Sequence, residues 1–202
     1  MIAAIVPAAG LSLRMGRPKL ILDLGGTPVI VRVVRALLDG GTDRVYVVVP
    51  PTGQDGAGQI RELVETAGAR AVVLPSATPD MRASIEHGLR VIVEELERPM
   101  GVLVAPGDAI GMSARVVSAV LAKFRSDPSR IVVPRREGLR AHPLALPWDV
   151  ALSIFALPLD SGVNVIVRDR ADLVDVIVID EPGPDSDLDT PEDYARLTRE
   201  GL

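Results

Sequence analysis

The 202-residue chain contains no cysteine, which excludes disulfide bonds, thiolate metal ligands and a cysteine nucleophile. Aromatic residues make up only 2% of it, so Val, Leu, Ile and Ala must build the core, and few rings are available to stack on bases. The net charge of −5 argues further against nucleic acid as a partner, because phosphate backbones are bound by basic faces. The 48% of hydrophobic residues indicates a well-packed α/β protein instead.

Long apolar runs and targeting segments are also missing. No run approaches the ~18 residues that span a bilayer, so we expect no membrane partner. Residues 1–6 lack the charged start of a signal peptide, and we therefore expect a cytoplasmic protein. The length suits one substantial core, which predicts a single domain over residues 1–202.

Lysine is scarce as well, and its placement singles out one loop. Only Lys19 and Lys123 are lysine among the 22 basic residues. Lys123 falls in a helical pattern, where a solvent-facing charge is the simplest interpretation. Lys19 ends a loop of small residues that follows an apolar strand predicted over residues 2–6. A compact ammonium on a flexible stem suits contact with a single phosphate oxygen in a tight space.

The loop over residues 7–19 has the composition of a polyphosphate site. Gly10 and Gly16 allow sharp turns and close approach of a ligand to the backbone. Three basic residues, Arg14 and Lys19 among them, add positive charge beside the loop amides. The glycine spacing fits neither the dinucleotide fingerprint nor the P-loop. A merely basic surface loop is the alternative, which the density of the motif disfavours.

Apolar runs and helical patterns alternate along the chain. Strands are predicted over residues 2–6, 45–49, 71–74, 100–105, 131–133, 143–146 and 174–179, and helices over 27–39, 59–66, 81–98, 113–124, 150–157, 163–168 and from 190 onward. Such alternation is typical of βαβ units. It predicts a Rossmann-like, three-layer α/β/α fold with a mostly parallel central sheet covered on both faces.

Residues 7–19 resemble the signature loop of nucleotidyltransferases with a glycosyltransferase-A-like (GT-A-like) fold. Within this group they are most similar to the molybdenum cofactor cytidylyltransferase family and its MobA-like relatives. The resemblance implies a GT-A-like fold, Mg²⁺ as cofactor, and a nucleoside triphosphate and a small phosphorylated acceptor as substrates. It also implies that the nucleotide is bound by Ala8, Ala9, Gly10, Ser12, Arg14, Gly16 and Lys19. The Ala-Ala-Gly start resembles the cytidylyl branch, so CTP is the expected nucleotide.

Asp108 is the candidate metal ligand. It follows the strand predicted over residues 100–105, and ligands of open α/β sheets bind beyond the carboxyl ends of strands. Mg²⁺ typically takes one or two carboxylates together with phosphate oxygens and water. Helix capping is the alternative role, and the family resemblance favours the metal. Residues 109–111 depart from the Gln-Pro or Met-Pro that the family usually has there.

An acidic segment near the end of the chain, residues 185–193, resembles the family motif D-I-D-T-P-E-D. Asp187 and Asp189 are two residues apart, so in an extended stretch they point the same way, and one of them is the expected second metal ligand. Glu192 and Asp193 fall in the first turn of a helix, where the macrodipole favours acids, and a structural role is expected for both.

The helix predicted over residues 81–98 carries a third motif. Its Met81, Ser84 and Gly88 match a family pattern whose serine lies near the nucleotide. Tight packing of this helix on the sheet is the alternative explanation of a glycine inside it. Met81 is also the first member of an apolar stripe that continues through Ile85, with helical spacing.

The acceptor-side motifs are altered. His142 precedes a proline, as in the family's Gly-His-Pro near the acceptor, but Ala141 stands in place of the glycine. Asn164 stands where the family has an arginine, which removes a bidentate contact to phosphate or carboxylate. Together with residues 109–111, three acceptor-side motifs differ while the nucleotide-side loop is intact.

These patterns predict a Mg²⁺-dependent nucleotidyltransferase with Arg14, Lys19 and Asp108 as catalytic residues. A phosphate monoester has its second pKa near 6, so an acceptor phosphate needs no general base to attack the α-phosphate and release pyrophosphate. Family resemblance alone implies molybdopterin as acceptor and a molybdoenzyme or its chaperone as partner. One alternative is another phosphorylated acceptor, such as a sugar phosphate or phospho-acid. Another is a nucleotide-binding regulator that has lost catalysis.

Overall fold

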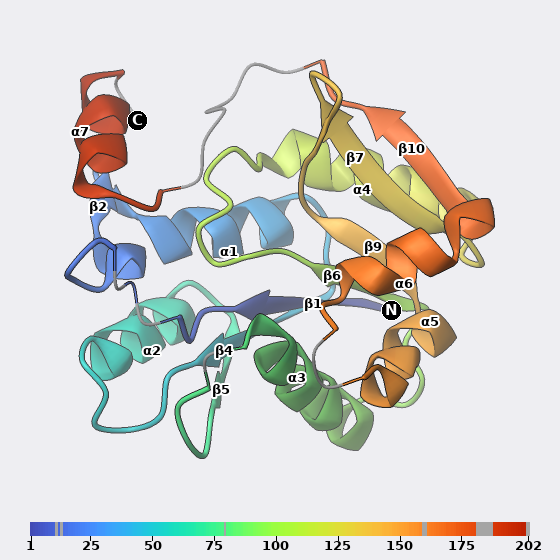
Figure 1. Ribbon diagram of the computed structural model, residues 1–202, viewed down its shortest axis with the longest axis horizontal. Coiled ribbons are helices and arrows are strands. Elements are labelled where there is room, and N and C mark those ends of the chain that lie inside the picture. Colours follow the sequence, from blue (N-terminus) through green and yellow to red (C-terminus); the bar gives the residue numbers. More distant parts are fainter. Residues whose placement is uncertain (11, 13, 79, 159–160, 181–187, 201–202) are drawn as a thin grey trace.

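Strand β1 (Ile2–Pro7) lies inside a mostly parallel sheet, shown in Figure 1. The computed structural model describes residues 1–10, 12, 14–78, 80–158, 161–180 and 188–200. Within these residues the sheet has the strand order β10-β7-β9-β6-β1-β4-β5, with the short β8 paired to β7. All pairings along this order are parallel except those of β9, which runs opposite to both of its neighbours.

The strands and helices alternate as the sequence predicts. The remaining strands of the sheet are β4 (Arg44–Val49), β5 (Arg70–Val73), β6 (Gly101–Val104), β7 (Ile131–Arg136), β8 (Leu139–Arg140), β9 (Leu144–Pro147) and β10 (Val174–Val178), and β2 (Asp23–Leu24) pairs with β3 (Thr27–Pro28) outside it. The helices are α1 (Val29–Asp39), α2 (Ala57–Thr66), α3 (Met81–Glu95), α4 (Ala114–Ser126), α5 (Trp148–Leu152), α6 (Asn164–Asp169) and α7 (Pro191–Arg199), with 3-10 turns at Lys19–Ile21, Ser153–Ala156 and Ala171–Leu173.

Two helical layers cover the sheet, which confirms the predicted three-layer α/β/α fold. Side chains of α1, α2, α4 and α7 pack in one core cluster, and those of α3, α5 and α6 pack in another on the opposite face. Figure 1 shows α1 and α4 on one side of the sheet and α3 and α5 on the other. None of the helices in the described parts is long and apolar enough to cross a bilayer.

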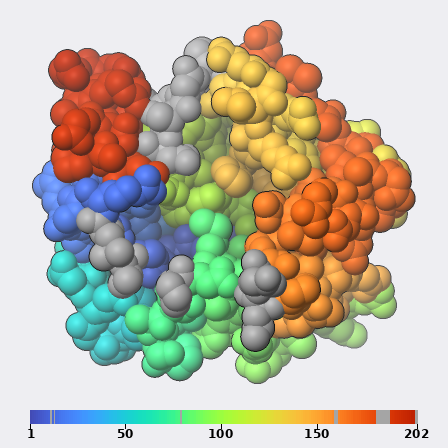
Figure 2. All heavy atoms as spheres, viewed as in Figure 1, coloured from blue at the N-terminus to red at the C-terminus, as the bar shows by residue number. Residues whose placement is uncertain are grey.

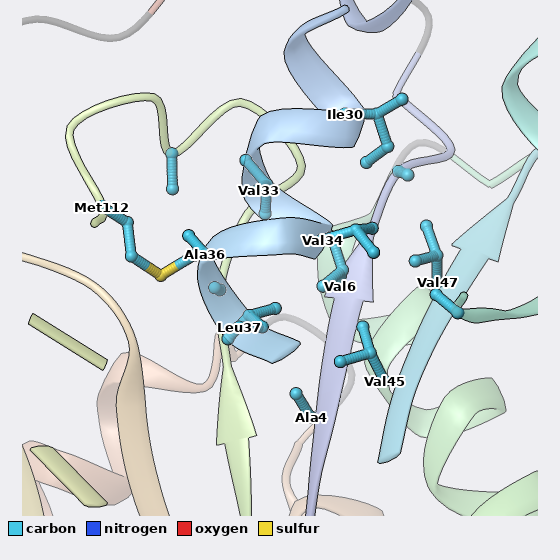
Figure 3. Close-up of a cluster of buried hydrophobic side chains, with 14 of the residues drawn as sticks. Ala4, Val6, Ile30, Val33, Val34, Ala36, Leu37, Val45, Val47 and Met112 are labelled. Atoms are coloured by element: carbon cyan, nitrogen blue, oxygen red, sulfur yellow. The ribbon is translucent and has the colours of Figure 1, made fainter. Parts of the chain in front are cut away.

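The alternation of side chains along β1 explains why it reads as a continuous apolar run. Ala4 and Val6 belong to the α1 cluster, whereas Ala3 and Ile5 belong to the α3 cluster. All four are completely buried. In Figure 3 the apolar side chains of α1 lie against those of β1 and β4, with Met112 beside them. A strand covered on both faces has no polar side, and this produces the unbroken hydrophobic segment.

Several element boundaries differ from the prediction. Helix α3 ends at Glu95 rather than near residue 98, and α2 begins at Ala57 rather than residue 59. Met81 is 54% exposed, so its assignment to the apolar stripe of α3 was wrong. It is the first residue of α3 and lines the cavity described below. The short pairs β2–β3 and β7–β8 were not predicted, because two-residue strands leave no periodic signal.

Helix α7 begins with a capping box. Thr190 Oγ1 accepts a hydrogen bond from the Asp193 N–H, and the Asp193 carboxylate accepts one from the Thr190 N–H. The carboxylate thus has a structural role, as part of a cap that was not itself predicted, and its hydrogen bonds to Thr190 hold the Asp193 pKa below the usual value. The helix is anchored by Leu197, which is completely buried.

Candidate functional site

The ends of β1 and β6 bring two loops together at one edge of the sheet. The Gly107 N–H donates to the Pro7 carbonyl at 3.1 Å. A Cβ added at Gly107 would lie 3.2 Å from Leu20 Cδ1 and 3.3 Å from both Ile30 Cδ1 and Pro7 O. Glycine therefore permits a close approach at this point, and it carries the next residue, Asp108, to the loop that follows β1.

A cavity of about 210 Å³ opens between these loops and the start of α3. Its lining residues are Pro7, Ala8, Ala9, Gly10, Ser12, Lys19, Leu20, Thr78, Asp80, Met81, Ser84, Pro106, Gly107 and Asp108. Figure 2 shows a hollow on this face, bordered by N-terminal, α3 and C-terminal atoms. The structure thus brings together most of the residues predicted to bind the nucleotide with the predicted metal ligand.

An ion cluster stands at this cavity. Lys19 Nζ lies 2.5 Å from Asp108 Oδ2 and 2.8 Å from Asp189 Oδ1, and Arg14 Nη2 lies 2.7 Å from Asp189 Oδ2. The side chains of Lys19 and Asp108 are each 18% exposed, whereas Arg14 is 72% exposed. The chain therefore assembles two carboxylates and two cations from three segments that are far apart in sequence.

The contacts in the cluster stabilise the charged forms of Lys19 and Asp189. Burial alone would lower the pKa of Lys19, but hydrogen bonds and charge from Asp108 and Asp189 outweigh it, and the pKa is raised above 10.5. The hydrogen bond from Lys19 holds the Asp189 pKa below its usual value despite partial burial. Because these two pKa values move apart, the ammonium and the Asp189 carboxylate both remain charged across neutral pH.

Other predicted site residues lie outside this cavity. Gly88 packs in α3 against β1 and β4, where an added Cβ would lie 3.0 Å from Ile5 Cγ2, so the packing alternative explains this glycine. Gly16 lines a neighbouring cavity of about 260 Å³. His142 and Asn164 line neither cavity within the described residues. Asp187 lies outside the described residues.

The turn after Asp108 is well defined despite its unusual sequence. The Ala109 N–H donates to the Pro106 carbonyl, and Ala109 and Met112 are both buried. Helix α4 is capped instead by Ser113, whose Oγ accepts from the Val116 N–H at 3.2 Å. This assigns the capping role, which had been the alternative for Asp108, to another residue.

Comparisons with known proteins identify the family. Residues 4–174 match the MobA-like NTP transferase domain. The chain belongs to this family. The family prediction made from residues 7–19 is thereby confirmed.

Two relatives match the MobA-like chain over most of its length. The phosphoenolpyruvate guanylyltransferase of Rubrobacter xylanophilus is 31% identical over 98% of this chain and 94% of that protein. The 2-C-methyl-D-erythritol 4-phosphate cytidylyltransferase of Frankia casuarinae is 29% identical over 87% of this chain and 70% of that protein. Proteins with the same cytidylyltransferase name from Streptomyces coelicolor and Rhodococcus jostii match locally, and the alignments span 23% of each.

Solved structures agree with this family membership. A nucleotidyl transferase from Methanothermobacter thermautotroptrophicus has a TM-score of 0.80 at 25% identity, with 100% of this chain and 98% of that chain covered. Rv0371c from Mycobacterium tuberculosis has a TM-score of 0.82 at 25% identity, with 98% of each chain covered. Its complex with manganese has a TM-score of 0.75 at 23% identity, with the same coverage. The GT-A-like fold predicted from the sequence is confirmed.

Sequence reasoning missed one buried charge of this MobA-like domain, Arg82 in the first turn of α3. Its side chain is 5% exposed. Nε donates to Glu86 Oε1 at 2.7 Å and Nη2 to the Leu157 carbonyl at 2.9 Å, while Nη1 donates to the carbonyls of Pro158 and Ser161. The guanidinium thus ties the start of α3 to the segment before α6. Its position in phase with Ile85 on the buried face was the available signal.

We expect Arg82→Met to lower the free energy of unfolding by about 3 kcal/mol, because it removes the buried partner of Glu86 and leaves the carbonyl groups of Leu157, Pro158 and Ser161 without this donor. Arg90→Met is the matched control on the same helix. Arg90 also pairs with Glu86, at 3.4 Å, but is 58% exposed, so a loss below about 1 kcal/mol is expected. Denaturant unfolding of both variants measures the difference, and equal losses would contradict the clamp role of Arg82.

Proposed function

We propose that this protein is a divalent-metal-dependent nucleotidyltransferase that transfers a nucleoside monophosphate to a phosphorylated acceptor and releases pyrophosphate. The observation that carries the proposal is the contact of Lys19 with Asp108 and Asp189 at a cavity floored by small residues. The family and the names of its relatives support the same reaction class. We further propose that the whole function resides in one domain over residues 1–202.

The donor set at the cavity fits a divalent cation of the magnesium type. Asp108 and Asp189 direct carboxylate oxygens to one point, the Lys19 ammonium. Within the described residues no group of three or more Asp, Glu, His or Cys side chains could hold a metal. Mg²⁺ suits such a sparse site, because it is commonly held by one or two carboxylates plus substrate phosphates. The manganese complex of Rv0371c supports a divalent ion, and we propose Mg²⁺ as the physiological one.

Residues of the loop over residues 7–19 have separate roles in binding the triphosphate. We propose that Lys19 and Arg14 hold the triphosphate, with Ser12, Gly16 and the loop amides around it, and that a metal on Asp108 and Asp189 would neutralise phosphate charge. The acceptor brings an ionised phosphate as nucleophile, so the chain supplies no general base. Catalysis then consists of positioning the attacking phosphate in line and stabilising charge on the leaving pyrophosphate.

We propose CTP as the nucleotide. Ala8 and Ala9 line the cavity and are 2% and 5% exposed, so they form a rigid floor beside Ser84 and Met81. We propose that these small side chains shape the pocket for a pyrimidine. The 31% identity to a named guanylyltransferase over nearly the full chain makes GTP the competing candidate.

The names of the relatives indicate a chemical class for the acceptor. The relatives from Frankia casuarinae and Rubrobacter xylanophilus are named for 2-C-methyl-D-erythritol 4-phosphate and for phosphoenolpyruvate, and both of these compounds carry a phosphate monoester. We propose a phosphate monoester for this chain, with molybdopterin as the specific candidate, His142 and Asn164 beside it, and a molybdoenzyme or its chaperone as the protein that receives the product.

Pyrophosphate release tests the function directly. The purified protein is incubated with Mg²⁺, with CTP or GTP, and with molybdopterin, 2-C-methyl-D-erythritol 4-phosphate or phosphoenolpyruvate. We expect release with CTP and molybdopterin and a larger thermal stabilisation by CTP than by GTP. Release with GTP alone would overturn the cytidylyl assignment, and release with another acceptor would overturn molybdopterin. Nucleotide binding without release from any pair would favour the regulator that has lost catalysis.

A further inference from the structure

The loop between β4 and α2 approaches the nucleotide-side loop closely where Gly56 lies beside Pro18. Gly56 precedes α2 in a left-handed conformation with φ +73°. A Cβ built on it would lie 2.8 Å from Pro18 Cγ and 2.9 Å from Pro18 Cβ. Carbon atoms do not approach this closely in folded proteins, so any side chain at Gly56 would force one of the two loops to move.

A side chain at Gly56 would displace Pro18, and this displacement would affect the neighbouring Lys19. Its ring is fused to the backbone, so the ring atoms cannot swing away as the end of a flexible side chain would. Pro18 directly precedes Lys19, whose N–H donates to Ser12 Oγ at 3.3 Å. A shift of the proline ring is therefore passed through one peptide bond to the lysine that contacts Asp108.

The other side of the contact is fixed more firmly. Helix α2 begins at Ala57 and is anchored through Ala57, Ile60 and Val64, which are 5%, 4% and 0% exposed. Beside the contact the two loops enclose the neighbouring cavity of about 260 Å³, lined by Gly16, Pro18 and Lys19 from one loop and by Gln54 and Asp55 from the other. The nucleotide-side loop therefore has space in which to shift, whereas α2 borders this cavity through Ile60, which is itself buried in the core.

We propose that Gly56 is a positioning residue for Lys19. The missing side chain lets the β4–α2 loop pack directly against the ring of Pro18, and this contact fixes where the ammonium of Lys19 stands at the cavity. Gly56 touches no substrate itself. The inference rests on the proposed function, because it assigns the β4–α2 loop a role in positioning Lys19, the residue proposed to contact the triphosphate.

The test compares two glycines of the same loop. Gly53 and Gly56 both have positive φ values, +93° and +73°, but nothing lies within 4 Å of a Cβ on Gly53. Gly56→Ala and Gly53→Ala therefore carry a similar backbone cost and differ in the clash with Pro18. We expect Gly56→Ala to weaken Mg²⁺-dependent CTP binding, measured by titration calorimetry, about tenfold or more, with parental affinity in Gly53→Ala.

Turnover should follow binding. We expect kcat/KM for CTP to fall on the order of 100-fold in Gly56→Ala, with the KM of the acceptor unchanged. A purely structural role would lower the melting temperature of both glycine variants and leave these constants alike. Equal CTP affinity in the two variants would overturn the inference while leaving the proposed function intact, whereas a parental protein that binds neither CTP nor GTP would overturn both.

A double variant covers the case in which Gly56→Ala does not fold. Pro18→Gly removes both ring atoms that a Cβ on Gly56 would meet. Pro18→Gly alone should weaken CTP binding, because Lys19 is no longer held, and adding Gly56→Ala to it should cause no further loss. A further loss in the double variant would show that Gly56 acts by a route other than Pro18 and would overturn the proposal.

Discussion

Asp108→Asn is expected to lower turnover by about 100- to 1000-fold while the protein stays folded. The substitution keeps the volume of the side chain and an oxygen that can accept from Lys19, but it removes the charge that would hold a divalent cation. Because Lys19 keeps its second partner, Asp189, at 2.8 Å, we expect the melting temperature to change little. Pyrophosphate release and thermal unfolding of the two proteins measure the two effects separately.

Metal binding distinguishes this role from a structural one. In the presence of CTP, the affinity for Mn²⁺ should fall with the turnover in Asp108→Asn. Asp149→Asn serves as a control, because Asp149 is 75% exposed and pairs only with the exposed Arg98 in the described contacts. If Asp108→Asn has a much lower melting temperature than the parent, yet turns over normally when folded, the role of Asp108 is structural.

The parts of the fold that were predictable are those with a local signal. Strand β1 is covered on both faces, so its sequence is continuously apolar, and it ends at a loop that contains Gly10 and Gly16. The start of helix α7 near Thr190 was predicted from residues 190–193, and in the structure Thr190 and Asp193 form a capping box there. In both places the residues that determine the structure are neighbours along the chain, and sequence reasoning can therefore identify them.

The features that could not be predicted from the sequence depend on contacts between residues that are distant along the chain. The four apolar residues of β9 carry no signal for direction, and its antiparallel orientation follows from pairing with β6 and β7. Lys19 and Asp189 are 170 residues apart, so their contact required the folded chain, although each had been selected separately. Besides Glu86, the partners of Arg82 are backbone carbonyls of residues 157, 158 and 161, which leave no trace in composition, and this is why it was overlooked.

Lys19→Arg is expected to lower turnover on the order of 100-fold with little change in melting temperature. The ammonium nitrogen of Lys19 lies 2.5 Å and 2.8 Å from two carboxylate oxygens, so it occupies a space sized for one small cationic group. A guanidinium is planar and wider, and its charge cannot sit at the same point. Lys19→Ala should be at least as damaging, because it removes the charge altogether.

A third variant separates phosphate binding from metal binding. Lys19→Met keeps most of the side-chain volume and leaves Asp108 and Asp189 without the ammonium between them. A divalent cation no longer competes with Lys19 for these carboxylates. We therefore expect Lys19→Met to bind Mn²⁺ more tightly than the parent in the absence of nucleotide, although it turns over more slowly with CTP.

Lys123 provides the control, because it is the only other lysine of the chain. It also forms an ion pair, with Asp175 at 2.6 Å, but its side chain is 41% exposed and lies outside the cavity. Lys123→Arg should keep parental turnover, since an exposed pair tolerates the wider group. Steady-state pyrophosphate release compares the two Lys→Arg changes. Near-parental rates for Lys19→Arg would mean that charge alone matters at this position, and the steric argument for Lys19 as a point contact to phosphate would be wrong.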